Sequence, residues 1–242
     1  NASEQFVKAT DGTHADLGIS VGTPKLDLGR MQVAKDDIVS GLTGGIDYLF
    51  KKNKITRLEG TARIDHAGEV SLVDGSDKGS YHCDRILIAT GSHASSLPNV
   101  AIDEKRIVSS TGALALTTLP KKLVVIGAGY IGLELGTVWA RLGAEVEVIE
   151  FLPRILPGMD EEVAKKFMAI AKRQGLKFRL KTAVKSAKAS KTGVSLMVEP
   201  AGGGDEEQID ADVALVSVGR HPATNGLGLE EAGVAVSDRG RI

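Results

Sequence analysis

The 242 residues include 30 Lys and Arg and 31 Asp and Glu, which gives a formal net charge of −1, and 42% of the residues are hydrophobic. A chain so close to neutral has no field to gather nucleic acid or an anionic membrane, and no apolar run approaches the roughly 20 residues of a membrane-spanning helix. The single cysteine, Cys83, excludes an internal disulfide, and the five histidines lack the spacing of metal ligands, so we expect no nucleic-acid partner, membrane span or metal.

The first third of the chain predicts a polar connection, a helix and several short strands. Residues 1–30 show no sustained hydrophobic periodicity and are interpreted as the connection. Met31–Lys54 carries apolar residues at helical spacing, and we expect an interruption near Gly44 and Gly45. Short strands are predicted at residues 55–59, 61–64, 69–73 and 85–89, the first three forming a β-meander added to the fourth as a parallel strand.

A polar linker at residues 92–120, with a short helix at 110–116, marks an expected domain boundary between residues 119 and 120. Beyond it, apolar segments alternate with helical ones: strand 123–126, helix Tyr130–Leu142 ending at Gly143, strand 145–150, helix 160–174 capped by Asp160, and strand 176–180. Antiparallel strands 184–190 and 194–200, a glycine-rich turn at 201–207 and a buried strand at 211–218 follow. The pattern predicts an α/β fold, a Rossmann-like parallel sheet with antiparallel β insertions.

The most specific motif is the glycine sequence that joins the strand at 123–126 to the helix at Tyr130. Gly127 allows a tight turn, Gly129 lets a pyrophosphate approach the backbone, and Gly132 lets helix and strand pack closely. The N-terminus of the helix adds free N–H donors and a partial positive charge. Because strand, glycines and helix occur in the expected order, the motif predicts a dinucleotide-phosphate site.

Glu150 ends the next strand, 150 − 127 = 23 residues after the first glycine. An acidic residue at about this distance hydrogen-bonds the adenosine ribose and favours NAD. It disfavours NADP, since a carboxylate about 4 Å from a 2′-phosphate costs on the order of 4 kcal/mol at an effective dielectric constant near 20. Arg154 could pair with such a phosphate, but a local or surface role is the simpler interpretation.

Six segments together resemble the pyridine nucleotide–disulfide oxidoreductase family, and in particular its dihydrolipoyl dehydrogenase branch. They are residues 41–54, Ile88-Ala-Thr-Gly-Ser92, Arg106-Ile-Val-Ser-Ser-Thr-Gly112, the Gly127 loop, Glu150-Phe-Leu-Pro-Arg154 and Ser217-Val-Gly-Arg220. The resemblance covers essentially the whole chain. It implies a partial FAD-binding domain at 1–119 and an NAD-binding domain at 120–242. The flavin glycine motif, the redox disulfide and a dimer domain with a His–Glu pair are not among these residues.

The resemblance also implies which residues contact each cofactor. Around NAD it places Gly127, Ala128, Gly129, Tyr130, Ile131, Gly132, Leu133, Glu134, Glu150, Val184 and Gly219, and against FAD it places Ala62, Thr90, Gly91 and Ser92. Ala62 stands where the family often has glycine and is tolerable only at negative φ. Several of these residues also have a purely structural interpretation. Glu134 could be a solvated helix residue and Val184 a core residue, and Gly219 and Thr90-Gly91 could be turns.

By the same resemblance, the parent enzyme oxidises dihydrolipoamide, carried on a lipoyl-bearing acyltransferase, and reduces NAD through FAD and a redox disulfide. It implies a homodimer serving a 2-oxo acid dehydrogenase complex, in a bacterial cytoplasm or the mitochondrial matrix. These 242 residues supply no catalytic residue, so we expect them to be inactive alone. Another FAD-dependent disulfide reductase, an NADH oxidase, or a non-catalytic NAD-binding module are the alternatives.

Overall fold

The computed structural model describes residues 2–242, and their packing divides the chain into two compact units. The first comprises the residues up to Ala34 together with Ala94–Gly219, and the second comprises Lys35–His93 with Arg220–Ile242. The boundary at Ala34 falls within helix α3 (Leu28–Lys52). Among residues 2–242, no helix combines the length and apolar character needed to span a bilayer.

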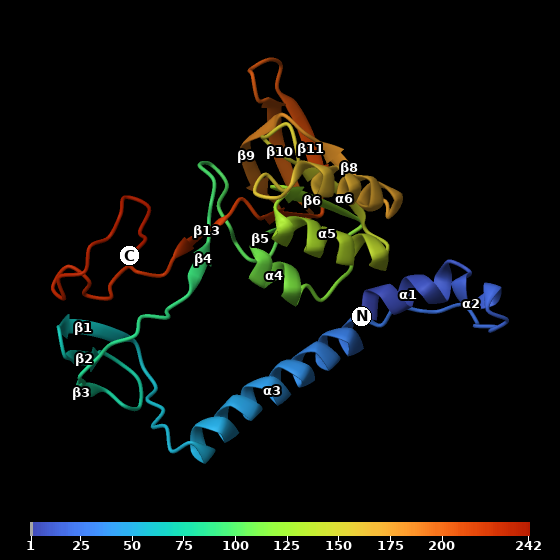
Figure 1. The fold of residues 1–242 in the computed structure, drawn as a ribbon. Helices are drawn as coiled ribbons and strands as arrows, with labels where there is room; N and C mark the ends of the chain where they lie inside the picture. The colour runs from blue at the N-terminus through green and yellow to red at the C-terminus, as the bar shows by residue number, and fades with distance from the viewer. Residues whose placement is uncertain (1) are drawn as a thin grey trace. The chain divides into compact units, whose positions relative to one another are not determined.

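The first unit is built on a five-stranded parallel sheet with the strand order β5-β12-β6-β7-β8 (Figure 1). Its strands are β5 (Ile107–Val108), β6 (Lys122–Ile126), β7 (Glu145–Ile149), β8 (Lys177–Arg179) and β12 (Val213–Val216). An antiparallel sheet of order β11-β10-β9 comprises β9 (Thr182–Ala189), β10 (Val194–Pro200) and β11 (Glu207–Ala211). The helices of this unit are α1 (Ala2–Thr10), α2 (Thr13–Asp16), the start of α3, α4 (Ser110–Ala115), α5 (Tyr130–Leu142) and α6 (Glu161–Arg173).

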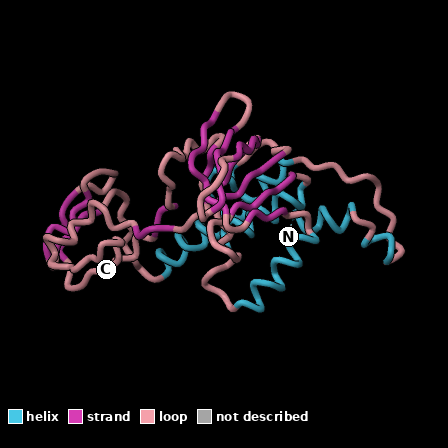
Figure 2. Tube along the Cα trace, turned by 90° about the horizontal axis from the view of Figure 1, so that it is seen from above, coloured by secondary structure: helices cyan, strands magenta, loops and turns pink. Residues whose placement is uncertain are grey.

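Alternate residues of the parallel strands face two different layers. Val125 of β6 belongs to the same buried cluster as Leu133 and Trp139 of α5, whereas Val124 belongs to a cluster with Leu196 of β10. Because successive side chains of a strand point to opposite faces, a strand covered on both sides must be apolar throughout. The unit therefore has a helical layer, a central parallel sheet and an antiparallel sheet. Figure 2 shows the helices in cyan and the strands of both sheets in magenta.

The predicted strand–helix–strand unit is confirmed. Helix α5 has the predicted bounds, and Gly143 ends it in the left-handed conformation with φ +112°. Asp160 caps α6, since its carboxylate accepts the N–H groups of Glu162 and Val163 at 2.9 and 3.1 Å. The antiparallel strands β9 and β10 also lie where they were predicted. The α/β class with a parallel sheet is therefore confirmed.

Residues 1–30 were predicted to be a polar connection, and this is wrong because they contain α1 and α2. Helix α1 packs on α5, with Phe6 against the buried cluster and an i,i+4 ion pair of 3.0 Å between Glu4 and Lys8. A helix of nine residues with so few apolar side chains has a weak periodic signal, and packing on α5 stabilises it. The short strands β5 and β11 were also missed, because two to five residues give little alternation to detect.

The compact units do not follow the division expected between residues 119 and 120. β5 precedes that division, yet it joins the central sheet by pairing Ile107 with Ala214 and Val108 with Leu215. A parallel strand is held by backbone bonds to its neighbour, so this segment packs with the strands that follow it in sequence. The expected division separates an FAD-binding part from an NAD-binding part of the chain. It stays a prediction.

The second unit contains two small sheets and most of α3. The strands are β1 (Ala62–His66), β2 (Glu69–Leu72) and β3 (Gly79–His82) in one antiparallel sheet, and β4 (Ser92–Ala94) with β13 (Arg220–Pro222) in the other. The N–H group of Ile64 donates to the carbonyl of Leu227 at 2.7 Å, which ties β1 to the C-terminal segment. Cys83 is half-buried and free, as expected.

Three predictions for this unit are wrong. Helix α3 runs through Gly44 and Gly45 without interruption, because glycine costs a helix only about 1 kcal/mol relative to alanine and does not forbid the helical conformation. Residues 55–59 and 85–89 form no strand, and Leu87 is 91% exposed. A strand needs a neighbour to satisfy its backbone, and within residues 2–242 none pairs with either segment.

A buried hydroxyl on α5 provides a first testable prediction. Thr137 is 9% exposed, and within the described residues its Oγ1 has no hydrogen-bond partner. Burying an unpaired hydroxyl costs about 1–3 kcal/mol. We expect Thr137→Val to raise the free energy of unfolding by about 1 kcal/mol, measured by urea denaturation with the fluorescence of Trp139, the only tryptophan.

Thr137→Ala is the control, because it removes the same hydroxyl but leaves a small cavity, and we expect no gain in stability. A loss of stability in Thr137→Val would show instead that a hydrogen bond to water satisfies the hydroxyl.

Candidate functional site

The turn after β6 brings Gly127 into close contact with the end of β12. Its N–H group donates to the carbonyl of Ile149 at 2.8 Å, its φ is +100°, and a Cβ there would lie 2.7 Å from the carbonyl oxygen of Ser217. Both the positive φ and the close backbone favour glycine. The tight turn predicted for this position is confirmed.

The two other glycines of the motif have opposite surroundings. At Gly132 an added Cβ would overlap the carbonyl oxygen of Gly127 and the hydroxyl of Ser217, and it would lie 2.8 Å from Cγ1 of Val125. At Gly129 an added Cβ would meet no atom within 4 Å. Gly132 therefore permits close packing of α5 on the sheet, whereas Gly129 leaves its side of the loop open to an approaching ligand.

The open side of the loop is also the N-terminus of α5. Gly129 is the N-cap residue, with φ −75° and ψ 175°, and it provides no side chain to cap the helix. The N–H groups of Tyr130, Ile131 and Gly132 in the first turn have no helical carbonyl one turn earlier. Such donors, with the positive end of the helix dipole, suit a phosphate group.

Glu150 lies beside this loop and is 8% exposed. Its carboxylate accepts the N–H group of Ala128 at 2.7 Å through Oε2 and that of Leu152 at 2.8 Å through Oε1. A carboxylate has about four lone-pair sites, so two hydrogen bonds leave each oxygen able to accept one more, as a ribose diol requires. The backbone N–H and C=O of Glu150 bond the carbonyl of Arg179 and the N–H of Thr182.

The register of the parallel sheet aligns the four loops that carry the residues predicted to contact NAD. Val216, Ile126, Ile149 and Arg179 are paired in succession across β12, β6, β7 and β8. Their carboxyl ends therefore share one edge, which presents Gly219, the Gly127 loop, Glu150 and the segment leading to Val184. Chain order reverses between β6 and β12, the point at which open α/β sheets bind ligands.

The remaining residues predicted around NAD differ in exposure. Ala128 and Leu133 are 0% and 1% exposed and belong to the core cluster, so only their backbone can serve a ligand. Tyr130 and Glu134 are exposed on α5, and Ile131 is half-buried. Val184 is half-buried against the cluster under β10, and Gly219 has φ +127°. A ligand contact of these side chains stays a prediction.

The residues predicted against FAD lie in the second unit, and their side chains are engaged within the protein. Thr90 Oγ1 donates to the carbonyl of Ala223 at 2.7 Å, and Ser92 Oγ accepts from Nε of Arg220 at 2.7 Å. Gly91 has φ +75° and open space around it. This geometry leaves the backbone of the turn open to a ligand.

Ala62, the fourth of these residues, lies in β1 and does not have a positive φ. The condition under which alanine is tolerable there is therefore met. Its contact with a flavin nucleotide stays a prediction.

Sequence reasoning missed the role of the Ser217 hydroxyl, which donates to the carbonyls of Ile126 and Gly127 at 3.0 and 3.1 Å. It ties the end of β12 to the glycine turn, and no local pattern marks it, because the contact spans about 90 residues. Arg154 has the local role expected of it. Its guanidinium donates to the carbonyls of Pro157 and Met159 at 2.7 and 2.8 Å.

Gly129→Ala tests the open side of the loop. We expect the free energy of unfolding to change by no more than about 1 kcal/mol, because φ is negative and the space is empty, leaving only a weaker N-cap. The affinity for NAD should fall about tenfold or more, ~1.4 kcal/mol, since a methyl group would stand where the pyrophosphate approaches the backbone. Calorimetric titration with NAD and urea denaturation separate the two effects, and equal NAD affinity would place the ligand elsewhere.

Comparison with known proteins finds a matching family model and several similar proteins. A family model described as pyridine nucleotide-disulphide oxidoreductase matches residues 4–242. A mitochondrial dihydrolipoyl dehydrogenase of Pisum sativum is 51% identical, with 94% of this chain and 46% of the relative aligned. Dihydrolipoyl dehydrogenase 3 of Pseudomonas putida is 50% identical, and the alignment covers 100% of this chain and 52% of the relative. A leghemoglobin reductase of Vigna unguiculata is 52% identical, and the alignment covers 94% of this chain and 44% of the relative.

The chain thus spans about half the length of the curated relatives it matches. Among solved structures, the HOCl-induced flavoprotein disulfide reductase RclA of Escherichia coli superposes with a TM-score of 0.77 at 25% identity. That match covers 98% of this chain and 50% of the other.

Proposed function

Because the chain belongs to the pyridine nucleotide-disulphide oxidoreductase family, we propose that it is the NAD-binding part, with a portion of the FAD-binding part, of a dihydrolipoyl dehydrogenase. The observation that carries the NAD assignment is the buried Glu150 carboxylate, hydrogen-bonded to the glycine loop through the N–H of Ala128. The branch assignment rests on relatives named dihydrolipoyl dehydrogenase at 50–51% identity.

The residues of the first unit fit an NAD molecule. The open side of Gly129 and the first-turn N–H groups of α5 suit the pyrophosphate, and the free lone pairs of Glu150 suit the ribose hydroxyls. Val184 would lie on the adenine side, and Glu134 and Gly219 on the nicotinamide side. Arg154 is bonded within its own loop, which supports NAD as the cofactor over NADP.

The second unit supplies only part of the proposed FAD site. The residues that contribute are Ala62 and, through their backbone, Thr90, Gly91 and Ser92. The chemistry supplied by the bound cofactors is electron transfer through the flavin and hydride acceptance by the nicotinamide. The protein's own task is to bind each cofactor and to orient its reactive part.

We propose dihydrolipoamide on a lipoyl-bearing acyltransferase as the electron donor of the complete enzyme. The same proposal includes a homodimer within a 2-oxo acid dehydrogenase complex, in a bacterial cytoplasm or the mitochondrial matrix. The named dehydrogenases of Pisum sativum and Pseudomonas putida support this choice. Cys83 is the only cysteine here, so these residues alone cannot form the redox disulfide, and we expect no turnover from them.

The test is the reduction of NAD by dihydrolipoamide with the full-length gene product, with NADP in parallel. We expect turnover with NAD and little with NADP. A flavin-loaded protein that turns over neither would remove the dihydrolipoamide assignment and leave the NAD site to be tested by direct titration.

A second candidate is another FAD-dependent disulfide reductase. Its support is the relative named leghemoglobin reductase, which is as similar as the dehydrogenases, and the fold shared with RclA. The same assay discriminates the two, because only a dihydrolipoyl dehydrogenase requires dihydrolipoamide as its donor.

A further inference from the structure

Arg179 is the last residue of β8, at the edge of the parallel sheet next to Glu150. The carbonyl of Arg179 accepts the N–H of Glu150 at 2.8 Å, and the carbonyl of Glu150 accepts the N–H of Thr182 at 2.9 Å. The carbonyl of Leu152 accepts the N–H of Lys181 at 3.1 Å. Residues 179–182 therefore form a backbone frame that holds the main chain of Glu150 and Leu152, and so the residue whose carboxylate we assign to the ribose.

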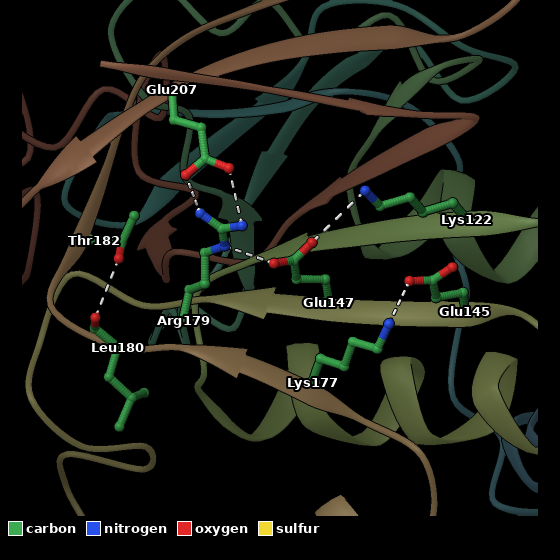
Figure 3. Close-up of polar contacts among 8 residues, drawn as sticks. All are labelled: Lys122, Glu145, Glu147, Lys177, Arg179, Leu180, Thr182 and Glu207. Atoms are coloured by element: carbon green, nitrogen blue, oxygen red, sulfur yellow. Dashed lines mark hydrogen bonds and ion pairs between the residues drawn. The ribbon is translucent and has the colours of Figure 1, made fainter. Parts of the chain in front are cut away.

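The side chain of Arg179 joins three strands (Figure 3). Its Nε donates to Glu147 of β7 at 2.7 Å, and its two terminal nitrogens form a fork on Glu207 of β11 at 2.5 and 3.1 Å. Lys122 of β6 lies 3.7 Å from the other oxygen of Glu147. A bidentate arginine–carboxylate pair fixes orientation as well as charge, so this network ties the parallel sheet to the antiparallel one.

The network lies where the chain crosses between the two sheets. β8 is a three-residue edge strand, and β9 begins three residues after Arg179, in the other sheet. The connection contains Lys181, at φ +53°, and is closed by the hydroxyl of Thr182, which donates to the carbonyl of Leu180 at 3.1 Å. An edge strand this short has few ladder bonds of its own, so side-chain contacts must help to fix the crossing.

The electrostatics of the network are favourable. The side chain of Arg179 is 35% exposed and that of Glu147 only 12%. The hydrogen bonds that Arg179 donates to Glu207 and then to Glu147 raise the pKa of Arg179 above its ordinary value, and the bond from Arg179 lowers the pKa of Glu207. Arg179 and Glu207 therefore hold their opposite charges more firmly than isolated side chains would. Lysine cannot replace this fork, because its ammonium is a single point charge.

We propose that Arg179 is a positioning residue for the nucleotide: its contacts with Glu147 and Glu207 hold the crossing that fixes Glu150 and directs Val184 toward the adenine side. This inference rests on the proposed NAD site and touches no reacting atom. It predicts an effect on NAD recognition, because the network holds the main chain of Glu150 and the segment that leads to Val184.

The test compares Arg179→Met in the full-length enzyme with Lys177→Met as a matched control. Lys177 pairs with Glu145 on the same two strands at 2.6 Å, but that pair is more exposed. We expect Arg179→Met to raise the KM for NAD about five- to tenfold, with kcat and the KM for dihydrolipoamide unchanged, and Lys177→Met to change none of the three.

Two further variants test the same inference if Arg179→Met does not fold. Arg179→Lys keeps the charge without the fork and should resemble Arg179→Met. Glu207→Gln keeps the shape of an exposed side chain and should raise the KM for NAD about two- to threefold. The inference would be overturned if the KM for NAD were unchanged in both Arg179→Lys and Glu207→Gln. It would also be overturned if the KM values for NAD and for dihydrolipoamide rose equally.

A second readout does not depend on NAD. Amide hydrogen exchange of Glu150, Lys181 and Thr182 should accelerate in Arg179→Met but not in Lys177→Met, because the hydrogen bonds of these three N–H groups make up the frame. Equal exchange in the two variants would refute the positioning role. If the unmodified enzyme fails to bind NAD but exchange still accelerates, the proposed function fails while the structural role of Arg179 holds.

Discussion

Replacing Gly132 with alanine is expected to lower the free energy of unfolding by about 3 kcal/mol. The new Cβ would overlap the carbonyl oxygen of Gly127 and the hydroxyl of Ser217, which the fold holds in place. Overpacking of a core costs typically about 1–3 kcal/mol, and a backbone obstacle places this site at the upper end. The measurement is urea denaturation followed by the fluorescence of Trp139, which is 3% exposed on the same helix.

Gly136→Ala is the matched control, one turn further along α5. There an added Cβ would lie 3.4 Å from Cγ1 of Val146 and 3.5 Å from Cγ2 of Val125, which is ordinary contact. Because alanine is favoured over glycine in a helix by about 1 kcal/mol, we expect no loss of stability. Similar destabilisation by both substitutions would show that crowding around α5 in general, and not the glycine turn, limits the packing.

Removing the carboxylate of Glu150 is expected to have the largest effect on ligand binding. In Glu150→Ala the affinity for NAD should fall about 100-fold, on the order of 3 kcal/mol, because both the ribose acceptor and the anchor of the Ala128 N–H are lost. The preference over NADP should narrow as well, since the repulsion of a 2′-phosphate disappears. Calorimetric titration of the full-length protein with each nucleotide measures both effects.

Glu145→Ala is the control, at the start of β7, the strand that Glu150 directly follows. Glu145 is exposed, and its pKa is lowered by the hydrogen bond from Lys177. Its removal changes the charge by the same amount without touching the glycine loop, so NAD affinity should stay within about twofold. If the two substitutions weakened NAD equally, the effect of Glu150 would be one of net charge and not of contact.

The glycine loop at residues 127–132 could be predicted in detail because its determinants are local. Gly127, Gly129 and Gly132 have three different steric tasks within six residues, and each task follows from the turn and helix in which the residue stands. Helix α5 could be bounded for the same reason, since a glycine in the left-handed conformation ends it at Gly143. Such features follow from the local backbone conformation, while the obstacle that Ser217 adds at Gly127 and Gly132 comes from the end of another strand.

The errors lie where a segment depends on partners far away in the chain. Residues 85–89 have the composition of a strand but pair with none of the described strands, and residues 2–10 are polar but become helical by packing on α5. The two glycines within α3 lower helix propensity without preventing the helix. Composition sets a preference in each case, and long-range contacts decide the outcome.

The sequence by itself therefore determined the α/β class, the glycine turn and the acidic residue beside it, for which we propose the ribose contact. Only the tertiary structure decided that Glu150 is anchored by the N–H of Ala128, that Ser217 holds the turn from another strand, and that Arg179 joins two sheets beside them. The physical reason is that hydrogen bonds between residues 22 to 91 positions apart leave no periodic trace in the sequence. They exist only once the strands are paired in register.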